Sequence, residues 1–209
     1  MKRVFEVFLC LIFLSLLWWV FLIAYMGIKI YSPGPAIFKA KRIGKDGKII
    51  TVYKFRTMCV DSGKVRLTTL ANDERIFGFG SFLRKAKIDE FPQIFNVLLG
   101  NMEIVGPRPE DQENADLYYV GKYQEILSVK PGLTSPASLL DYVIGEEYDD
   151  MDLYEKEILP KKLEMEVYYV RNKSIIYDVE IIFRTIIIII QKVLGKSNFK
   201  YPKEYFMVP

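Results

Sequence analysis

The sequence contains no histidine among its 209 residues. Histidine is the commonest general base near neutral pH and the commonest side-chain ligand of transition metals. Any catalysis must therefore use carboxylates, Lys, Tyr, Ser or Cys. Any bound metal is expected to be a hard cation that is held by oxygen ligands.

Cysteine and net charge are also low. Cys10 lies in an apolar run and Cys59 follows an expected strand, which makes neither a disulfide framework nor a metal-ligand pattern. This usage fits a reducing, cytoplasmic environment. The formal charge is only +3, which is too small to indicate a nucleic-acid binder. No nucleic-acid partner is therefore expected.

A long hydrophobic run follows the basic start Met1-Lys2-Arg3. No charged residue occurs from Val7 to Ile28. At ~1.5 Å per residue this is roughly 33 Å of helix, enough for a bilayer core of ~30 Å. Residues 1–30 are therefore expected to form a membrane helix, and residues 31–209 a cytoplasmic catalytic domain. A buried helix of a soluble core is the minor alternative.

Basic residues flank both ends of the run, with Lys2 and Arg3 before it and Lys29 after it. The positive-inside rule places both flanks in the cytoplasm. A re-entrant hairpin satisfies this rule and a straight span does not, but both topologies stay open. Trp18-Trp19 and an isolated Ser15 occupy the middle of the run, and a helical serine bends a helix less than a proline does.

The rest of the chain predicts an α+β fold that is mainly helical with a small β-hairpin. Asp46-Gly47 is a tight-turn pair between residues that favour strands. Helices are expected over Ser81–Lys87 and from near Asp89 to Gly100. The segment from Gly121 to Asp152 reads as loop-rich. The apolar spacing near the C-terminus, over 174–196, predicts an amphipathic helix that lies on a membrane or against the core.

Asp89 and Glu90 are adjacent carboxylates at the start of the expected helix. Taken alone, they are typical of a helix cap. The same helix end also favours bound anions, and two carboxylates could hold Mg²⁺ or provide a nucleophile for phosphoryl transfer. Capping and catalysis both remain open at this point.

The segment VGPRP places Arg108 between Pro107 and Pro109, which restrict the backbone around it. A braced guanidinium suits bidentate binding of phosphate. Arg56 and Arg84 are further candidates for phosphate binding, although each could form an exposed salt bridge instead. Together with the apolar run, these residues indicate phosphate chemistry at a membrane surface.

Four blocks of sequence resemble the monotopic phosphoglycosyl transferases, the bacterial sugar transferase family. They occur in order and are YKFRTM, FGSFLRKAKIDEFPQIFNVLLGNMEIVGPRPE, KPGLTS and LEMEVYYVRNKSIIYDVEIIFRT. The resemblance implies transfer of a phosphosugar from a UDP-sugar to polyprenyl (undecaprenyl) phosphate, with release of UMP. This would be an early membrane step of glycoconjugate assembly on the cytoplasmic face of the inner membrane. Membrane lipids are implied as partners, and a homodimer is left open.

The resemblance also implies roles for individual residues. Asp89 matches the nucleophile that forms a covalent intermediate, and Glu90 matches its partner, which binds Mg²⁺ or positions Asp89. Arg84 and Arg108 match arginines near the phosphates, and Pro107 and Pro109 shape that loop. Gln93 belongs to the same motif.

The sequence departs from the family pattern where Trp18-Trp19 stands in place of a Ser-Pro pair, and where Ser135-Pro136 replaces Gly-Trp. Glu6 and Glu166 stand where Asp is usual. Two rival functions remain. One is a non-catalytic membrane scaffold with the same fold. The other is a metal-dependent glycosyltransferase that uses Asp150 and Asp152 and releases UDP.

Overall fold

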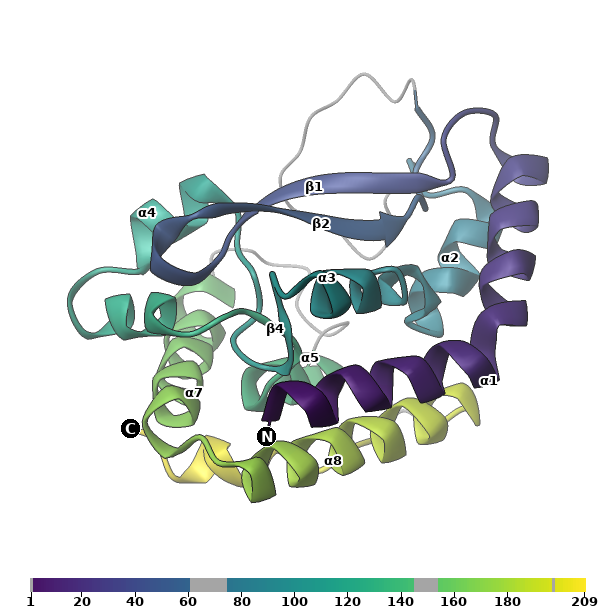
Figure 1. The fold of residues 1–209 in the computed structure, drawn as a ribbon. Coiled ribbons are helices and arrows are strands. Elements are labelled where there is room, and N and C mark those ends of the chain that lie inside the picture. Colours follow the sequence, from purple (N-terminus) through teal and green to yellow (C-terminus); the bar gives the residue numbers. More distant parts are fainter. Residues whose placement is uncertain (1, 61–74, 145–153, 197) are drawn as a thin grey trace.

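A computed structural model describes residues 2–60, 75–144, 154–196 and 198–209. Asp150 and Asp152 of the rival glycosyltransferase hypothesis lie outside these residues. The described part is mainly helical and contains two small two-stranded sheets. The β-hairpin forms one edge of the molecule, while α8 and the first half of α1 run along the opposite edge (Figure 1).

The hairpin has the strands and the turn that the sequence predicts. Strands β1 (Ile37–Ile43) and β2 (Ile49–Phe55) pair antiparallel, with Ile43 opposite Ile49. Asp46 has φ 58° and Gly47 has φ 74°, so the turn needs the left-handed backbone that Asp-Gly tolerates. The prediction of a hairpin is confirmed.

The segment that contains Asp89 and Glu90 lies on two short elements rather than on one helix. After α2 (Gly78–Lys85), a 3₁₀ turn covers Ile88–Glu90 and α3 covers Gln93–Leu99. The expectation that the helix begins near Asp89 is therefore wrong by about one turn. Pro92 lacks a backbone N–H, which interrupts the ladder between the tight turn and α3. Gly100, with φ 84°, ends α3 as predicted.

A short parallel sheet was not predicted. Strands β3 (Glu103–Val105) and β4 (Gly132–Thr134) pair with Glu103 opposite Gly132. The two backbones approach so closely that a Cβ on Gly132 would lie 2.1 Å from the Gly106 nitrogen. Only glycine fits there. The connection between the strands contains α4 (Gln112–Tyr118) and a 3₁₀ helix (Gly121–Ser128).

The segment from Gly121 onward is not loop-rich, so that expectation is wrong for its described part. Besides the 3₁₀ helix, it contains α5 (Pro136–Ile144). Ser135 caps α5, because its hydroxyl accepts a hydrogen bond of 3.0 Å from the Ser138 amide. Pro136 is the first helical residue, where a missing N–H costs nothing. The Ser135-Pro136 pair therefore marks the start of a helix, which the sequence analysis did not recognise.

Four elements complete the fold. A π-helical turn (Tyr154–Ile158) leads into α7 (Leu159–Asn172), and α8 follows over Ile175–Val193. The predicted C-terminal helix is confirmed, and its first turn is capped by the Ser174 side chain. A 3₁₀ turn (Lys203–Phe206) packs against α8, where Arg184 pairs with the buried Glu204.

Helix α1 (Lys2–Tyr31) bends sharply between its halves although it contains no proline (Figure 1). The Ser15 hydroxyl donates to the Ile12 carbonyl at 2.8 Å, a local bond that accompanies helix bends. The halves pack on different clusters. Cys10 packs with α3 and the hairpin, while Ala24 and Ile28 pack with α2 and the end of β2.

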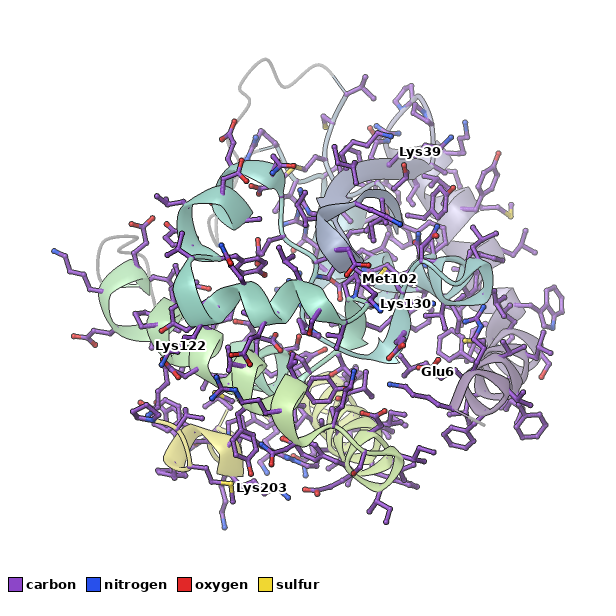
Figure 2. All side chains as sticks on the ribbon, turned by 60° about the vertical axis from the view of Figure 1, so that its left-hand side comes forward. Glu6, Lys39, Met102, Lys122, Lys130 and Lys203 are labelled. Atoms are coloured by element: carbon purple, nitrogen blue, oxygen red, sulfur yellow. The ribbon has the colours of Figure 1, made fainter. Side chains whose placement is uncertain are left out.

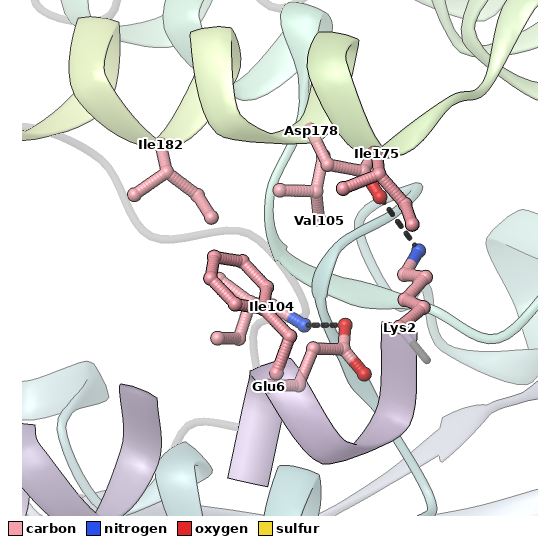
Figure 3. Close-up of a pocket in the computed structure, with 8 residues that line it drawn as sticks. Lys2, Glu6, Ile104, Val105, Ile175, Asp178 and Ile182 are labelled. Carbon is pink, nitrogen blue, oxygen red and sulfur yellow. Dashed lines mark hydrogen bonds and ion pairs between the residues drawn. The ribbon is translucent and has the colours of Figure 1, made fainter. Parts of the chain in front are cut away.

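The start of α1 is fixed to the rest of the molecule by polar contacts. Figure 2 shows Glu6 on the α1 side of the molecule, and its side chain is buried. Glu6 accepts a hydrogen bond of 3.0 Å from the Ile104 amide, and Lys2 pairs with Asp178 of α8 at 2.8 Å (Figure 3). Arg3 donates to the carbonyl groups of the last turn of α3. The first half of α1 therefore lies beside both α3 and α8.

Within the described residues, α1 is the single helix that is long and apolar enough to cross a membrane by length and composition. Only 11% of its most hydrophobic window is buried, which differs from the core helix of a soluble protein. Its exposed side chains include Trp18 and Trp19, and α8 exposes Phe183 and Ile187. Both helices thus present large apolar surfaces that the rest of the described residues does not cover.

Candidate active site

The carboxylate of Asp89 is buried and incompletely paired. Asp89 is the central residue of the 3₁₀ turn, and only 9% of its surface is exposed. Its Oδ1 accepts no hydrogen bond from the described residues. The N-cap of α3 is Pro92, and neither the turn nor α3 has a side-chain cap. The helix-capping interpretation of Asp89 is therefore not supported, because its side chain caps neither of these two elements.

Glu90 has the opposite environment, because two cations contact one of its oxygens. Lys54 from β2 lies 2.9 Å from Oε1, and Arg108 Nη2 lies 3.2 Å from the same atom. Burial alone would raise the pKa of Glu90, but Lys54 and Arg108 outweigh it and hold that pKa well below its usual value. For Asp89, burial and the neighbouring Glu90 charge raise the pKa.

Lys54 belongs to this site although the sequence analysis did not select it. It lies in the YKFRTM block, in which the sequence analysis selected only Arg56 as a candidate for phosphate binding. Asn96 of α3 explains how Lys54 reaches Glu90. Asn96 Oδ1 accepts from the Tyr53 amide at 3.0 Å, and Asn96 Nδ2 donates to the Thr51 carbonyl at 2.6 Å. These two bonds fasten α3 to the edge of β2 and bring Lys54 beside Glu90.

Arg108 is positioned by the parallel sheet and by α7. The Gly132 amide donates to the Pro107 carbonyl at 2.9 Å, which holds the start of the loop. The Arg108 amide donates to Glu166 Oε1 at 3.3 Å, and the same oxygen accepts from the Ser135 hydroxyl at 2.8 Å. The guanidinium of Arg108 therefore extends from a braced backbone toward Glu90, as the flanking Pro107 and Pro109 suggested.

The other predicted residues divide into two groups. Arg84 donates to the Thr57 hydroxyl at 2.9 Å and is one of the cations that act on the Asp89 charge, so it borders the site. Gln93 is buried at the first position of α3, close in sequence to the carboxylates. Arg56 is turned elsewhere. It is buried and donates to the carbonyl groups of Ser32 and Pro35, both at 2.6 Å.

Arg56 therefore braces the turn between α1 and β1, and its described contacts do not join it to the carboxylates. Its guanidinium also donates to the Ser32 hydroxyl at 2.8 Å. A phosphate would have to compete with these buried bonds. Its predicted role in phosphate binding stays a prediction without a supporting contact.

The two carboxylates fit a magnesium ion that arrives with phosphate. No group of three or more metal-ligating side chains occurs in the part of the chain that the structure describes. Mg²⁺ commonly binds through one or two carboxylates together with water and substrate phosphates. The unpaired Asp89 Oδ1 is a hard oxygen ligand of this kind. Asp89 and Glu90 would hold the ion, and the phosphates would complete its coordination.

The family model for bacterial sugar transferases matches residues 1–192. The chain belongs to this family. A UDP-glucose:undecaprenyl-phosphate glucose-1-phosphate transferase of Escherichia coli (strain K12) is 36% identical over 189 residues, which cover 89% of this chain and 39% of that protein. The exopolysaccharide production protein PSS of Rhizobium leguminosarum bv. phaseoli is 37% identical over 90% of this chain and 94% of its own length.

A third relative acts on a different sugar. It is a UDP-N-acetylgalactosamine-undecaprenyl-phosphate N-acetylgalactosaminephosphotransferase of Aeromonas hydrophila, 36% identical over 76% of this chain and 36% of its own length. The chain thus spans about two fifths of the Escherichia coli relative and of other similar transferases. The matched region includes the site residues from Lys54 to Arg108 in the family comparison.

Proposed function

We propose that this protein is a phosphoglycosyl transferase that moves a phosphosugar from a UDP-sugar to undecaprenyl phosphate. The carrying observation is the asymmetry of the carboxylate pair. Asp89 Oδ1 is buried and has no hydrogen-bond partner among the described residues, while Glu90 is paired with Lys54 and Arg108. The printed names of the relatives, which describe glucose-1-phosphate and N-acetylgalactosamine-phosphate transfer, support this substrate class.

In the proposed first step, a carboxylate oxygen of Asp89 attacks the sugar-linked phosphorus of the UDP-sugar. A bond forms between that oxygen and phosphorus, the bond from phosphorus to the bridging oxygen breaks, and UMP leaves with the electron pair. The diphosphate of the UDP-sugar brings further negative charge to the carboxylates of Asp89 and Glu90. Arg84, Arg108 and Lys54 offset this charge. The pKa of Asp89 is raised, so its carboxylate is more basic than an ordinary aspartate.

In the second step, an oxygen of undecaprenyl phosphate attacks the same phosphorus. The bond from Asp89 to phosphorus breaks, the free carboxylate returns, and undecaprenyl-diphosphate sugar is released. Bound Mg²⁺ would supply charge neutralisation for the diphosphate. Glu90 stays anionic because its pKa is depressed, so it can hold the ion and keep Arg108 directed at the phosphates.

We place the protein on the cytoplasmic face of the inner membrane, with α1 as a re-entrant helix. A straight helix of 30 residues would be about 45 Å long and would separate its ends across a bilayer. Both ends of α1 instead contact the same domain. Lys2 pairs with Asp178 at 2.8 Å, and Lys29 donates to the Gly34 carbonyl at 2.7 Å. A bent, mostly exposed apolar helix with both basic ends on one side suits entry into a single leaflet.

The rival functions predict different products. A scaffold would not need the pairing of Lys54 and Arg108 on Glu90. A glycosyltransferase that uses Asp150 and Asp152 would release UDP, whereas the proposed reaction releases UMP. Measuring the released nucleotide with UDP-glucose, UDP-galactose and UDP-N-acetylgalactosamine therefore separates the three functions.

The test of the mechanism is intact-protein mass spectrometry after mixing with each UDP-sugar and no acceptor. Wild type should gain the mass of one phosphosugar and release UMP. Asp89→Asn keeps the size of the side chain but has a poor nucleophile, so it should fold normally, show no adduct and lose nearly all turnover. Glu90→Gln is the matched neighbour, which should still show a slow adduct. An Asp89→Asn enzyme that turns over near the wild-type rate would falsify the nucleophile assignment.

A further inference from the structure

An aromatic side chain at the border of the site lies between two lysines from distant segments. Tyr142 of α5 has Lys87 Nζ at 5.3 Å from its ring centroid and Lys192 Nζ at 5.9 Å. Lys87 precedes the catalytic 3₁₀ turn, and Lys192 is in the last turn of α8. Segments that are far apart in the sequence thus bring two positive charges to one aromatic ring.

This cluster is next to the carboxylate pair. The pKa of Tyr142 is raised by burial and by the Glu90 charge, with Arg108 opposing and with Asp89 also contributing. These influences require Tyr142 to lie within electrostatic range of both carboxylates. Lys87 in turn lowers the pKa of both Asp89 and Glu90. The cluster therefore adjoins the place where the phosphosugar would be held.

The backbone at Lys87 is unusual. Lys87 has φ 57° and ψ 18°, which is the left-handed region, and only Asp46 in the hairpin turn shares this among the described non-glycine residues. A non-glycine residue in this conformation costs about 1 kcal/mol, and such strain often occurs at functional sites. The conformation directs the chain from α2 into the catalytic turn while the side chain reaches Tyr142.

The other end of the cluster is at the apolar surface. Lys192 is surrounded in sequence by Ile190, Val193 and Leu194, which are 52%, 63% and 80% exposed. These side chains continue the exposed apolar surface of α8, which we take to face the lipid. A lysine at the edge of such a surface can keep its ammonium at the level of lipid headgroups. The three residues therefore connect the headgroup level of the membrane to the carboxylate pair.

We propose that Lys192, Tyr142 and Lys87 form the binding path for the phosphate of the lipid acceptor. This inference rests on the proposed function and assigns the acceptor side of that site. Arg84, Arg108 and Lys54 surround the carboxylates and serve the donor phosphates. Lys192 and Lys87 attract the phosphate monoester of undecaprenyl phosphate from the membrane surface, and the Tyr142 ring keeps the two ammonium groups apart and oriented.

The two half-reactions provide the test. Adduct formation needs only the UDP-sugar, whereas discharge of the adduct needs undecaprenyl phosphate. The purified chain is placed in mixed micelles, and both rates are measured for wild type, Lys192→Gln, Lys87→Gln and the double variant. The matched control is Lys196→Gln, which removes an exposed lysine beyond the end of α8 whose Nζ lies 5.7 Å from the Phe199 ring.

Each single variant should raise the KM for undecaprenyl phosphate roughly tenfold, as expected for loss of one charge-assisted contact. For Lys192→Gln, adduct formation should slow by less than about twofold, because the donor cations remain. Lys87→Gln also removes a charge that acts on Asp89, so only a larger effect on discharge than on adduct formation is expected for it. Added salt should raise the KM for undecaprenyl phosphate in wild type more steeply than in the double variant. Lys196→Gln should match wild type in every measurement.

The failures are distinguishable. If wild type forms no adduct with any UDP-sugar, the proposed function itself is wrong. If wild type forms the adduct but Lys192→Gln discharges it with an unchanged KM for the lipid, the assigned path is wrong. Equal slowing of adduct formation and discharge would mean that these lysines act on the donor, which also overturns the inference.

Discussion

Glu166 offers a quantitative test of the support behind Arg108. It is buried in α7, its Oε1 accepts from the Ser135 hydroxyl and the Arg108 amide, and its Oε2 has no partner among the described residues. Burial raises the pKa of Glu166 from 4.5 to about 7, against the opposing effects of these bonds and of Lys162. Asp141 adds to the rise, and Glu166 in turn raises the pKa of Tyr119.

Because the folded-state pKa exceeds the unfolded one, the folded protein holds a proton between pH 4.5 and about 7 that the unfolded chain has released. Stability therefore falls as the pH rises through this window. At ~1.4 kcal/mol for each tenfold change in the acid constant, ionising Glu166 costs about 3 kcal/mol by pH 8. Glu166→Gln imitates the protonated acid, so it should equal wild type near pH 5 and exceed its stability near pH 8.

The assay is urea unfolding in detergent micelles, followed by far-UV circular dichroism at several pH values. Glu164→Gln is the control on the same helix. Although burial opposes it, hydrogen bonds from Lys122 and Tyr123 lower the pKa of Glu164. Its contribution to stability is present above its unfolded pKa and is lost as the pH falls. Glu164→Gln should therefore lose stability at high pH. A difference between Glu166→Gln and wild type that stays constant from pH 5 to pH 8 would refute the reasoning.

Two further predictions concern the metal and the topology. EDTA should abolish UMP release and Mg²⁺ should restore it, because a bound divalent cation would offset the negative charge that the diphosphate and the two carboxylates bring together; full activity in excess EDTA would exclude the ion. Lys2 and Lys29 should both react with a membrane-impermeant amine reagent only from the cytoplasmic side of membrane vesicles. Labelling of Lys2 from the opposite side would establish a straight span. Such a span is incompatible with the ion pair between Lys2 and Asp178.

The parts of the fold that the sequence predicts are those encoded by local chemistry. Asp46-Gly47 determines the hairpin turn, and the periodic apolar residues of α8 determine that helix. The parallel pairing of β3 with β4 depends on the close approach of Gly106 and Gly132, which are far apart in sequence. Three-residue strands carry too little periodicity to be recognised.

The candidate site follows the same division. Asp89 and Glu90 were evident because adjacent carboxylates precede a proline. Lys54 could not be recognised from the sequence, because its position beside Glu90 depends on the hydrogen bonds of Asn96 to β2. Arg56 was overvalued for a related reason. The sequence shows its charge but not the buried carbonyl groups that take up its donors.

Neighbouring carboxylates become useful for catalysis when their environments differ. If Asp89 and Glu90 shared the same cations, both would be stabilised anions and neither would be a strong nucleophile. Among the described residues, Lys54 and Arg108 form ion pairs with Glu90, which lowers its pKa. Burial and the Glu90 charge raise the pKa of Asp89, although Lys54 and other cations oppose this rise. Such a division between two titratable neighbours commonly separates their chemical roles. The 3₁₀ turn contributes to it, because consecutive residues of such a turn point about 120° apart, so the two side chains reach different surroundings.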